Sequence, residues 1–177
     1  SFIIGSKIGK IELPKPTHSK GNYATVRMAF EGLHDNIPNQ KDFTTPKPST
    51  IEKMKTVPEG GNWRNFPDHL KTESMFTGKT HSSIYRRLEW DKPSVTIVNP
   101  RKTNLTHPSE NRILSIREVA KLFGVKDDFI FKGSLSAMQQ QLANAVPVKL
   151  ARAVASAVKL AIMQHNIRTK SETFQLV

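Results

Sequence analysis

The sequence predicts an α/β fold overall: an α+β, loop-rich small domain followed by a long C-terminal helix. Prolines and glycines, 11 and 9 of the 177 residues, lie mostly before residue 100, which favours loops in the first half. Residues 112–147 carry the capping and apolar patterns of two short helices. Residues 147–164 form a helix with apolar residues on two sides.

The N-terminal third of the chain is expected to hold one strand and one helix. Residues 1–5 are a short apolar run ended by glycine, and we expect a buried strand that begins before residue 1. Thr25 is the expected cap of a helix whose apolar face consists of Val26, Ala29, Phe30 and Leu33.

The middle of the chain alternates between loops and short elements. Residues 35–48 are expected to be loop, and Ser49 with Glu52 forms an S-x-x-E capping box for a helix that ends before Pro58. The glycine turn at residues 60–61 leads into Trp63, which is either a core anchor or a binding element. We expect residues 68–83 to be a mobile loop, residues 94–98 a β-branched strand and residues 101–104 a basic turn.

Residues 112–147 give the strongest local patterns. Ser115 and Glu118 form a capping box, and Ile116, Val119, Ala120 and Phe123 share one helical face. Gly124 stands where a left-handed C-terminal cap is expected. Ser136 and Gln139 repeat the pattern as S-x-x-Q, and Pro147 suits the first turn of the last helix.

The last helix has too few neighbours in this sequence. One apolar stripe contains Val148, Ala151, Ala155, Val158 and Ile162, and a second contains Leu150, Val154, Ala157 and Ala161. A helix that is apolar on two sides must be covered on both. The sequence therefore predicts a missing partner surface, and self-association through this helix is one way to supply it.

Composition narrows the class of partner and of chemistry. The net charge is +12, and it is positive in every successive block of fifty residues, which favours a polyanion such as nucleic acid; a generally solvated basic surface is the alternative. The absence of cysteine excludes disulfides, thiolate metal sites and a cysteine nucleophile in this chain. The six histidines show no metal-ligand spacing. Neither a membrane-span pattern nor a signal-peptide pattern is present, so we expect a cytoplasmic location.

Residues 112–147 resemble the last two motifs of the DNA (cytosine-5) methyltransferases, R-x-L-T-x-R-E-x-A-R-L-x-G-F-P-D-x-F and Q-x-G-N-A-V-P. The matches in register are Arg112, Leu114, Arg117, Glu118, Ala120, Leu122, Gly124, Asp128, Phe129, Asn144, Ala145, Val146 and Pro147. Residues 2–5, 13–18, 60–64 and 85–97 resemble further family segments. The chain departs from the family pattern at Ser115 (family Thr), at residues 125–126 (family Phe-Pro) and at Ala143 (family Gly).

The resemblance implies methyl transfer from S-adenosylmethionine to carbon 5 of a cytosine flipped out of double-stranded DNA, with attack by a cysteine thiolate. The family carries its cofactor loop, cysteine and glutamate in the motifs F-x-G-x-G, P-C-Q and E-N-V, and none of these occurs in residues 1–177. We therefore expect no catalytic residue here and an inactive chain in isolation. The expected partner is a catalytic half, supplied by the same chain upstream or by a separate subunit.

The resemblance also assigns roles to individual residues. It places Ala143, Asn144 and Ala145 beside the S-adenosylmethionine pocket, although Asn144, three residues before Pro147, also suits a helix N-terminal cap. It gives the ninth motif a structural role that is carried by Arg112, Ser115, Arg117 and Glu118. For DNA contact it favours Lys79, Arg86, Arg87, Thr96, Arg101 and Lys102, each of which has a solvated surface position as its alternative.

Three segments follow from this interpretation. Residues 1–13 would end a strand of the catalytic domain, residues 14–132 would form the target-recognition domain with the ninth motif, and residues 133–177 would carry the tenth motif and the helix that packs back on a Rossmann-like methyltransferase domain. The alternative function is a stand-alone basic DNA-binding module without catalytic activity.

Overall fold

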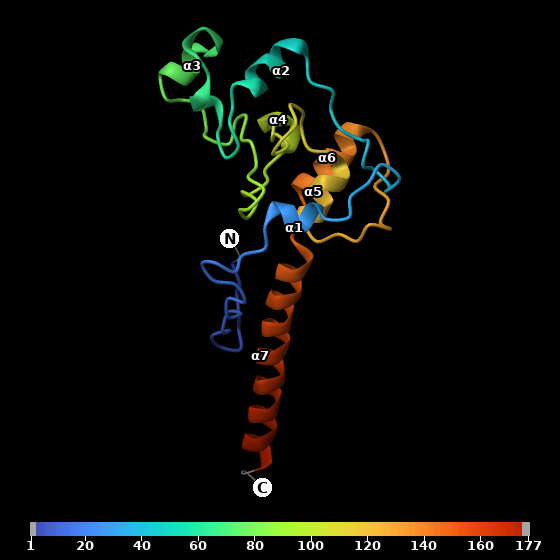
Figure 1. The fold of residues 1–177 in the computed structure, drawn as a ribbon. Coiled ribbons are helices and arrows are strands. Elements are labelled where there is room, and N and C mark those ends of the chain that lie inside the picture. Colours follow the sequence, from blue (N-terminus) through green and yellow to red (C-terminus); the bar gives the residue numbers. More distant parts are fainter. Residues whose placement is uncertain (1–2, 175–177) are drawn as a thin grey trace. The chain divides into compact units, whose positions relative to one another are not determined.

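The computed structural model describes residues 3–174, which divide into two compact units (Figure 1). The larger unit is Lys20–Ala145, and the smaller unit joins Ser1–Ser19 to Val146–Val177. The sequence-based boundary at residues 132–133 differs from this division, because the helix of the tenth motif packs inside the larger unit.

The larger unit consists of short helices joined by loops. Its elements are α1 (Val26–Phe30), α2 (Pro48–Lys55), η1 (Trp63–Asn65), η2 (Asp68–Leu70), α3 (Glu73–Phe76), α4 (Pro100–Thr103), α5 (Ile116–Leu122) and α6 (Leu135–Ala143). Residues 68–83, expected to be a mobile loop, thus contain a 3₁₀ turn and a turn of α-helix.

Residues 3–174 contain little β-structure, so the α/β expectation is not confirmed. The β pairings found there are isolated bridges of Thr106 with Arg87 and with Ile113. The predicted strand at residues 94–98 is wrong as a hydrogen-bonded strand, yet its alternation is real: Val95 and Ile97 pack on the core while Thr96 and Val98 are exposed. An extended segment becomes a ladder strand only where another backbone pairs with it.

The predicted strand at residues 1–5 falls partly on residues 1–2, which lie outside the described residues. Residues 3–5 are not part of a strand, and Ile3 is 99% exposed. A buried strand needs neighbours on both edges or on one face, and residues 3–174 provide none here.

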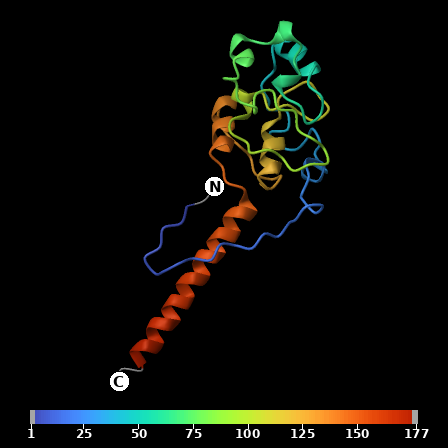
Figure 2. The same ribbon diagram turned by 90° about the vertical axis from the view of Figure 1, so that its left-hand side faces the viewer.

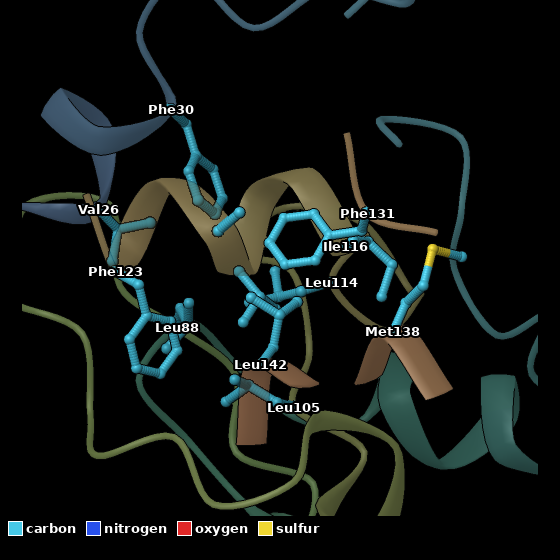
Figure 3. Packing of buried hydrophobic residues seen from close by; sticks show 12 residues of the cluster. Val26, Phe30, Leu88, Leu105, Leu114, Ile116, Phe123, Phe131, Met138 and Leu142 are labelled. Atoms are coloured by element: carbon cyan, nitrogen blue, oxygen red, sulfur yellow. The ribbon is translucent and has the colours of Figure 1, made fainter. Parts of the chain in front are cut away.

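Two hydrophobic clusters form the core of the larger unit. The first, which we call the α5 cluster, gathers α1, α5 and α6 around the predicted apolar face of α5 (Figure 3). Its buried members are Val26, Phe30, Leu88, Leu105, Leu114, Ile116, Val119, Ala120, Phe123, Phe131, Met138 and Leu142. Burial of so many aliphatic and aromatic side chains is the main favourable term in the folding of this unit.

The second cluster, which we call the Trp63 cluster, joins α2, η1 and α3. Its buried members are Met54, Val57, Trp63, Phe66, Met75, Tyr85 and Ile113. The indole Nε1 of Trp63 donates to the carbonyl of His81 at 3.0 Å, and Phe66 meets Tyr85 edge to face. Trp63 is therefore a core anchor, the first of its two sequence-based interpretations.

The predicted helix caps are confirmed at two helices. The Thr25 side chain accepts from the Met28 amide, and Ser115 and Glu118 cap α5 reciprocally. Gly124 has φ +73°, as its position after α5 predicts.

The predicted caps are wrong at two other helices. Lys47 rather than Ser49 precedes α2, because Pro48 occupies the first turn and needs no capping partner. The cap of α6 is Ser134, whose side chain accepts from the Ala137 amide, and not Ser136.

The smaller unit contains α7 (Val148–Phe174), which is longer than the predicted helix at residues 147–164. Figures 1 and 2 show the N-terminal segment beside this helix, and a shallow hollow of about 360 Å³ lies between residues 10–14 and residues 153–164. Apolar side chains of α7 remain exposed, among them Leu160, which lines this hollow, and Ile162. No helix within residues 3–174 is long and apolar enough to cross a membrane.

Candidate nucleic-acid interface

The candidate DNA contacts with the most accessible side chains are Lys79, Thr96 and Lys102. Lys79 follows α3, Thr96 lies in the loop at residues 94–98, and Lys102 lies on α4; all three are exposed. Within residues 3–174, neither lysine forms an ion pair that would neutralise it. The backbone of Arg101 belongs to α4, but its side chain lies outside the described part of the structure.

Arg86 is half-buried and partly committed to the protein. Its Nη1 donates to the carbonyl of Gly60, and its Nη2 lies 3.5 Å from the Glu89 carboxylate. The backbone of Arg86 accepts from the Thr106 amide, which follows α4 closely in sequence. The structure therefore brings Arg86 and α4 onto neighbouring segments, whereas separate segments carry Lys79 and Thr96.

Arg87 occupies the interior of the larger unit and not its surface. Its side chain is only 4% exposed. The guanidinium donates to the carbonyls of Met54, Val57, His107 and Glu110, each at 2.8 Å, and to the side-chain oxygen of Asn111 at 2.6 Å. These five bonds use all five guanidinium N–H groups. Burial lowers the pKa of Arg87, and no donor is left for a DNA phosphate, so we remove Arg87 from the candidate contacts.

The ninth-motif residues form a second buried polar group. Arg112 Nη1 and Nη2 donate to the two carboxylate oxygens of Glu118 at 2.8 and 2.7 Å, and Nε donates to Glu110 at 2.8 Å. Glu118 is only 2% exposed and also accepts from the Ser115 amide at 2.8 Å. Burial opposes the charge of Arg112, but the hydrogen bonds to Glu118 and Glu110 outweigh it and raise the pKa of Arg112.

Arg117 connects α5 to the loops on either side. Its side chain is fully buried and donates to the carbonyls of Pro38, Lys126 and Phe129. Burial lowers the pKa of this guanidinium. The polar groups of the four ninth-motif residues all form hydrogen bonds within the protein, which is the arrangement that a structural motif requires. These residues are Arg112, Ser115, Arg117 and Glu118.

His107 is a buried residue of this region to which the sequence analysis assigned no role. Its ring stacks on Phe30 with centroids 5.9 Å apart and meets Trp90 edge to face. Nδ1 accepts from the amides of Ser109 and Glu110 at 3.3 and 3.1 Å. Burial lowers the pKa of His107, and the nearby Glu118 carboxylate only partly opposes this. The histidine-proline pair before the ninth motif gave no sequence signal for such a position.

The candidate cofactor residues follow α6. Asn144 is the C-terminal cap of α6, and its side-chain oxygen accepts from Gln140 Nε2 at 3.0 Å. The expected N-terminal cap of the last helix is thus a C-terminal cap of the preceding one. Asn144 is exposed, and Ala145 packs against the α5 cluster. The carboxamide of Asn144 therefore lies exposed between two small residues, with its oxygen already bonded to Gln140.

Known proteins are similar to this chain over most of its length, including the ninth and tenth motifs. The family model of the C-5 cytosine-specific DNA methylases matches residues 1–160. The type II methyltransferase M.PspPI of Psychrobacter sp. (strain TA137) is 36% identical over 154 residues, which are 83% of this chain and 37% of the relative. M.Eco47II of Escherichia coli is 36% identical over 134 residues, 71% of this chain and 32% of the relative. M1.HphI of Haemophilus parahaemolyticus is 36% identical over 157 residues, which are 85% of this chain and 40% of the relative.

The family match covers the whole of the larger unit, including its buried ninth-motif network. The chain belongs to the C-5 cytosine-specific DNA methylase family. It spans between 32% and 40% of the length of these three curated relatives.

Proposed function

We propose that this chain is the DNA-recognition part of a DNA (cytosine-5) methyltransferase, which transfers a methyl group from S-adenosylmethionine to cytosine C5 in a specific DNA sequence. The observation that carries the proposal is the family match over residues 1–160 in a chain without cysteine. Attack on the cytosine ring needs a thiolate, so another polypeptide segment supplies the nucleophile. The chain alone is inactive in this proposal, and its place of action is the cytoplasm, where bacterial DNA lies.

In this proposal the larger unit makes the contacts with DNA. Lys79, Arg86, Arg101 and Lys102 are the proposed phosphate contacts, and Thr96 is the proposed base contact. Exposed lysines without an ion pair retain their full charge for a phosphate, and they give affinity without sequence information. A threonine can meet a base edge by hydrogen bonding or through its methyl group.

The catalytic half is the proposed partner of α7. Leu160 and Ile162 are exposed on this helix, and burying such side chains contributes about 1.5–3 kcal/mol each. In the complete enzyme, a Rossmann-like methyltransferase domain is proposed to cover these apolar side chains of α7. When that domain is missing, a second copy of the chain covers them instead. In this proposal residues 1–13 and 133–177 meet the catalytic domain, although α6 (Leu135–Ala143) also packs inside the larger unit.

Residues 143–145 are the proposed contribution of this chain to the cofactor pocket. S-adenosylmethionine supplies the methyl group when it is bound. The exposed side chain of Asn144 offers an amide donor and acceptor for its polar groups, while Ala143 and Ala145 leave room for a close approach. Most of the pocket belongs to the catalytic half in this proposal.

Reconstitution tests the proposal. The chain is co-expressed with the part of M.PspPI that lies outside the aligned stretch, and incorporation of labelled methyl groups into duplex DNA is measured. We expect methylation from the mixture and none from either part alone. Salt-dependent DNA binding without methylation in the mixture would favour the alternative, a stand-alone basic DNA-binding module. That alternative has one supporting observation: the larger unit contains two hydrophobic clusters of its own.

A further inference from the structure

The two hydrophobic clusters of the larger unit are joined through a layer of polar side chains. This polar layer consists of Arg87, His107, Glu110, Asn111, Arg112 and Glu118. Arg87 binds the carbonyls of Met54 and Val57, two members of the Trp63 cluster, on one side. On the other side it binds the His107 carbonyl, and the ring of His107 stacks on Phe30 of the α5 cluster.

Arg87 also closes the end of α2. The Met54 and Val57 carbonyls lie at the C-terminal end of this helix, where backbone acceptors lack intrahelical donors and a cation is favourable. A lysine at this position could offer three N–H groups from one point, whereas the five acceptors of Arg87 lie around a planar fork. The guanidinium therefore fixes both the distance and the orientation between α2 and residues 107–111.

The proposed phosphate contacts are divided between the two clusters. Lys79 follows α3, whose Met75 belongs to the Trp63 cluster, and the Lys79 amide donates to the Ser74 carbonyl. Lys102 lies on α4, which packs against α6 of the α5 cluster. Phosphates along DNA have fixed spacings, so simultaneous contact by both lysines requires the two clusters to keep one relative placement.

We infer that Arg87 is a positioning residue for DNA recognition: it holds the Trp63 cluster in register with the α5 cluster, so that Lys79 and Lys102 reach the same duplex. This inference rests on the proposed function for its DNA part. Its structural part concerns only the relative placement of the two clusters.

Hydrogen exchange of the 177-residue chain tests the structural part. Arg87→Lys keeps the charge but loses at least two hydrogen bonds, so α2 amides should exchange on the order of 30-fold faster while α5 amides change little. Arg64→Lys is the matched control, because Arg64 is an exposed arginine over Trp63, and it should leave both helices unchanged. Equal acceleration in α2 and α5 would make Arg87 a general stabiliser and overturn the inference.

A milder variant covers the case in which Arg87→Lys unfolds the chain. Asn111→Ala removes one of the five acceptors, the side-chain oxygen at 2.6 Å. It should accelerate exchange of α2 amides about fivefold and spare α5. An unchanged α2 in this variant, beside an unfolded Arg87→Lys protein, would refute the positioning role.

The salt dependence of DNA binding tests the functional part, with a 30-base-pair duplex of mixed sequence as probe at about 50–200 mM salt. Lys79→Ala should lower the slope of log K against log salt by about 0.9, the share of one phosphate. Arg87→Lys should lower it by a similar amount, and the double variant should lower it no further, because both remove the same contact. Additive losses would overturn the inference, as would a wild-type slope retained by Arg87→Lys. Absence of salt-dependent binding by the wild type would instead contradict the proposed function and leave the exchange result to decide on Arg87.

Discussion

Helices α5 and α7 are both rich in apolar residues, but their surroundings differ. The buried side of α5 is covered by α1 and α6, and even its charged residues Arg117 and Glu118 are satisfied by partners inside the larger unit. Apolar side chains of α7 remain exposed, including Leu160 at 56% and Ile162 at 46%. The comparison teaches that the larger unit completes its own core, whereas α7 carries exposed apolar side chains that, in the proposed function, the catalytic half covers.

The buried ion pair beside α5 should give the largest effect. Glu118→Ala leaves the half-buried Arg112 with the exposed Glu110 as its remaining carboxylate partner, so the loss should lie near the low end of the about 3–5 kcal/mol that removing one partner of a buried pair costs. Urea unfolding followed by circular dichroism measures this. Glu52→Ala is the control: it removes an exposed pair with Lys55 on α2, and its effect should stay below about 0.5 kcal/mol. Equal losses of unfolding free energy in the two variants would contradict the claim that the Arg112–Glu118 pair stabilises the protein more than an exposed ion pair does.

A charge on α7 should separate stability from assembly. Ile162→Glu places a carboxylate on an exposed position, so the free energy of unfolding of the larger unit should change by less than about 0.5 kcal/mol. In the reconstituted enzyme the same carboxylate would be buried, and methyl transfer should fall at least about tenfold. Lys159→Glu, at an exposed position of the same helix outside both apolar stripes, should retain activity. Full activity of Ile162→Glu would show that this face meets no partner.

Acid should weaken the larger unit through His107. Its folded pKa lies below the ordinary value of 6.5, so below pH 6.5 the unfolded chain binds a proton that the folded chain does not. Stability from this residue is therefore complete above pH 6.5 and declines as the pH falls toward the lowered pKa. The slope is at most about 1.4 kcal/mol per pH unit. Urea unfolding of wild type and His107→Gln at pH 7.5 and 5.5 measures the difference, which should be smaller in the variant.

The smallest effect concerns an exposed lysine of the larger unit. Lys102→Gln should leave the unfolding free energy unchanged and lower the salt slope of DNA binding by about 0.9. Lys126→Gln, also an exposed lysine in a part of the unit to which we assign no DNA contact, is the control and should keep the wild-type slope. Fluorescence anisotropy with a labelled duplex gives both slopes, and a loss of equal size in the two variants would argue for a diffuse basic surface.

Local signals in the sequence were sufficient for some elements. The caps at Thr25 and Ser115, the apolar face of α5 and the left-handed Gly124 depend on residues within one or two helical turns, so pattern alone predicts them. The expected cap of α6 at Ser136 was wrong, because Ser134, two positions earlier, takes that role.

Long-range contacts decided the features that the sequence did not predict. Arg87 is buried because acceptors 20 to 33 positions away in sequence converge on it, and no local pattern distinguishes it from its exposed alternatives. Residues 94–98 alternate as a strand does but lack a pairing backbone. The buried position of His107 likewise depends on its ring contacts with Phe30 and Trp90, which no short-range pattern in the sequence connects to it.

Hydrogen exchange of the isolated chain, with and without the catalytic half, tests the contrast between the two helices most directly. The account predicts strong protection of α5 (Ile116–Leu122) in both samples, since its core is complete. It predicts weak protection of α7 (Val148–Phe174) in the isolated chain and a large gain when the catalytic half is added, because helices in water depend on tertiary packing. Protection of α7 equal to that of α5 in the isolated monomer, unchanged by the catalytic half, would contradict the account.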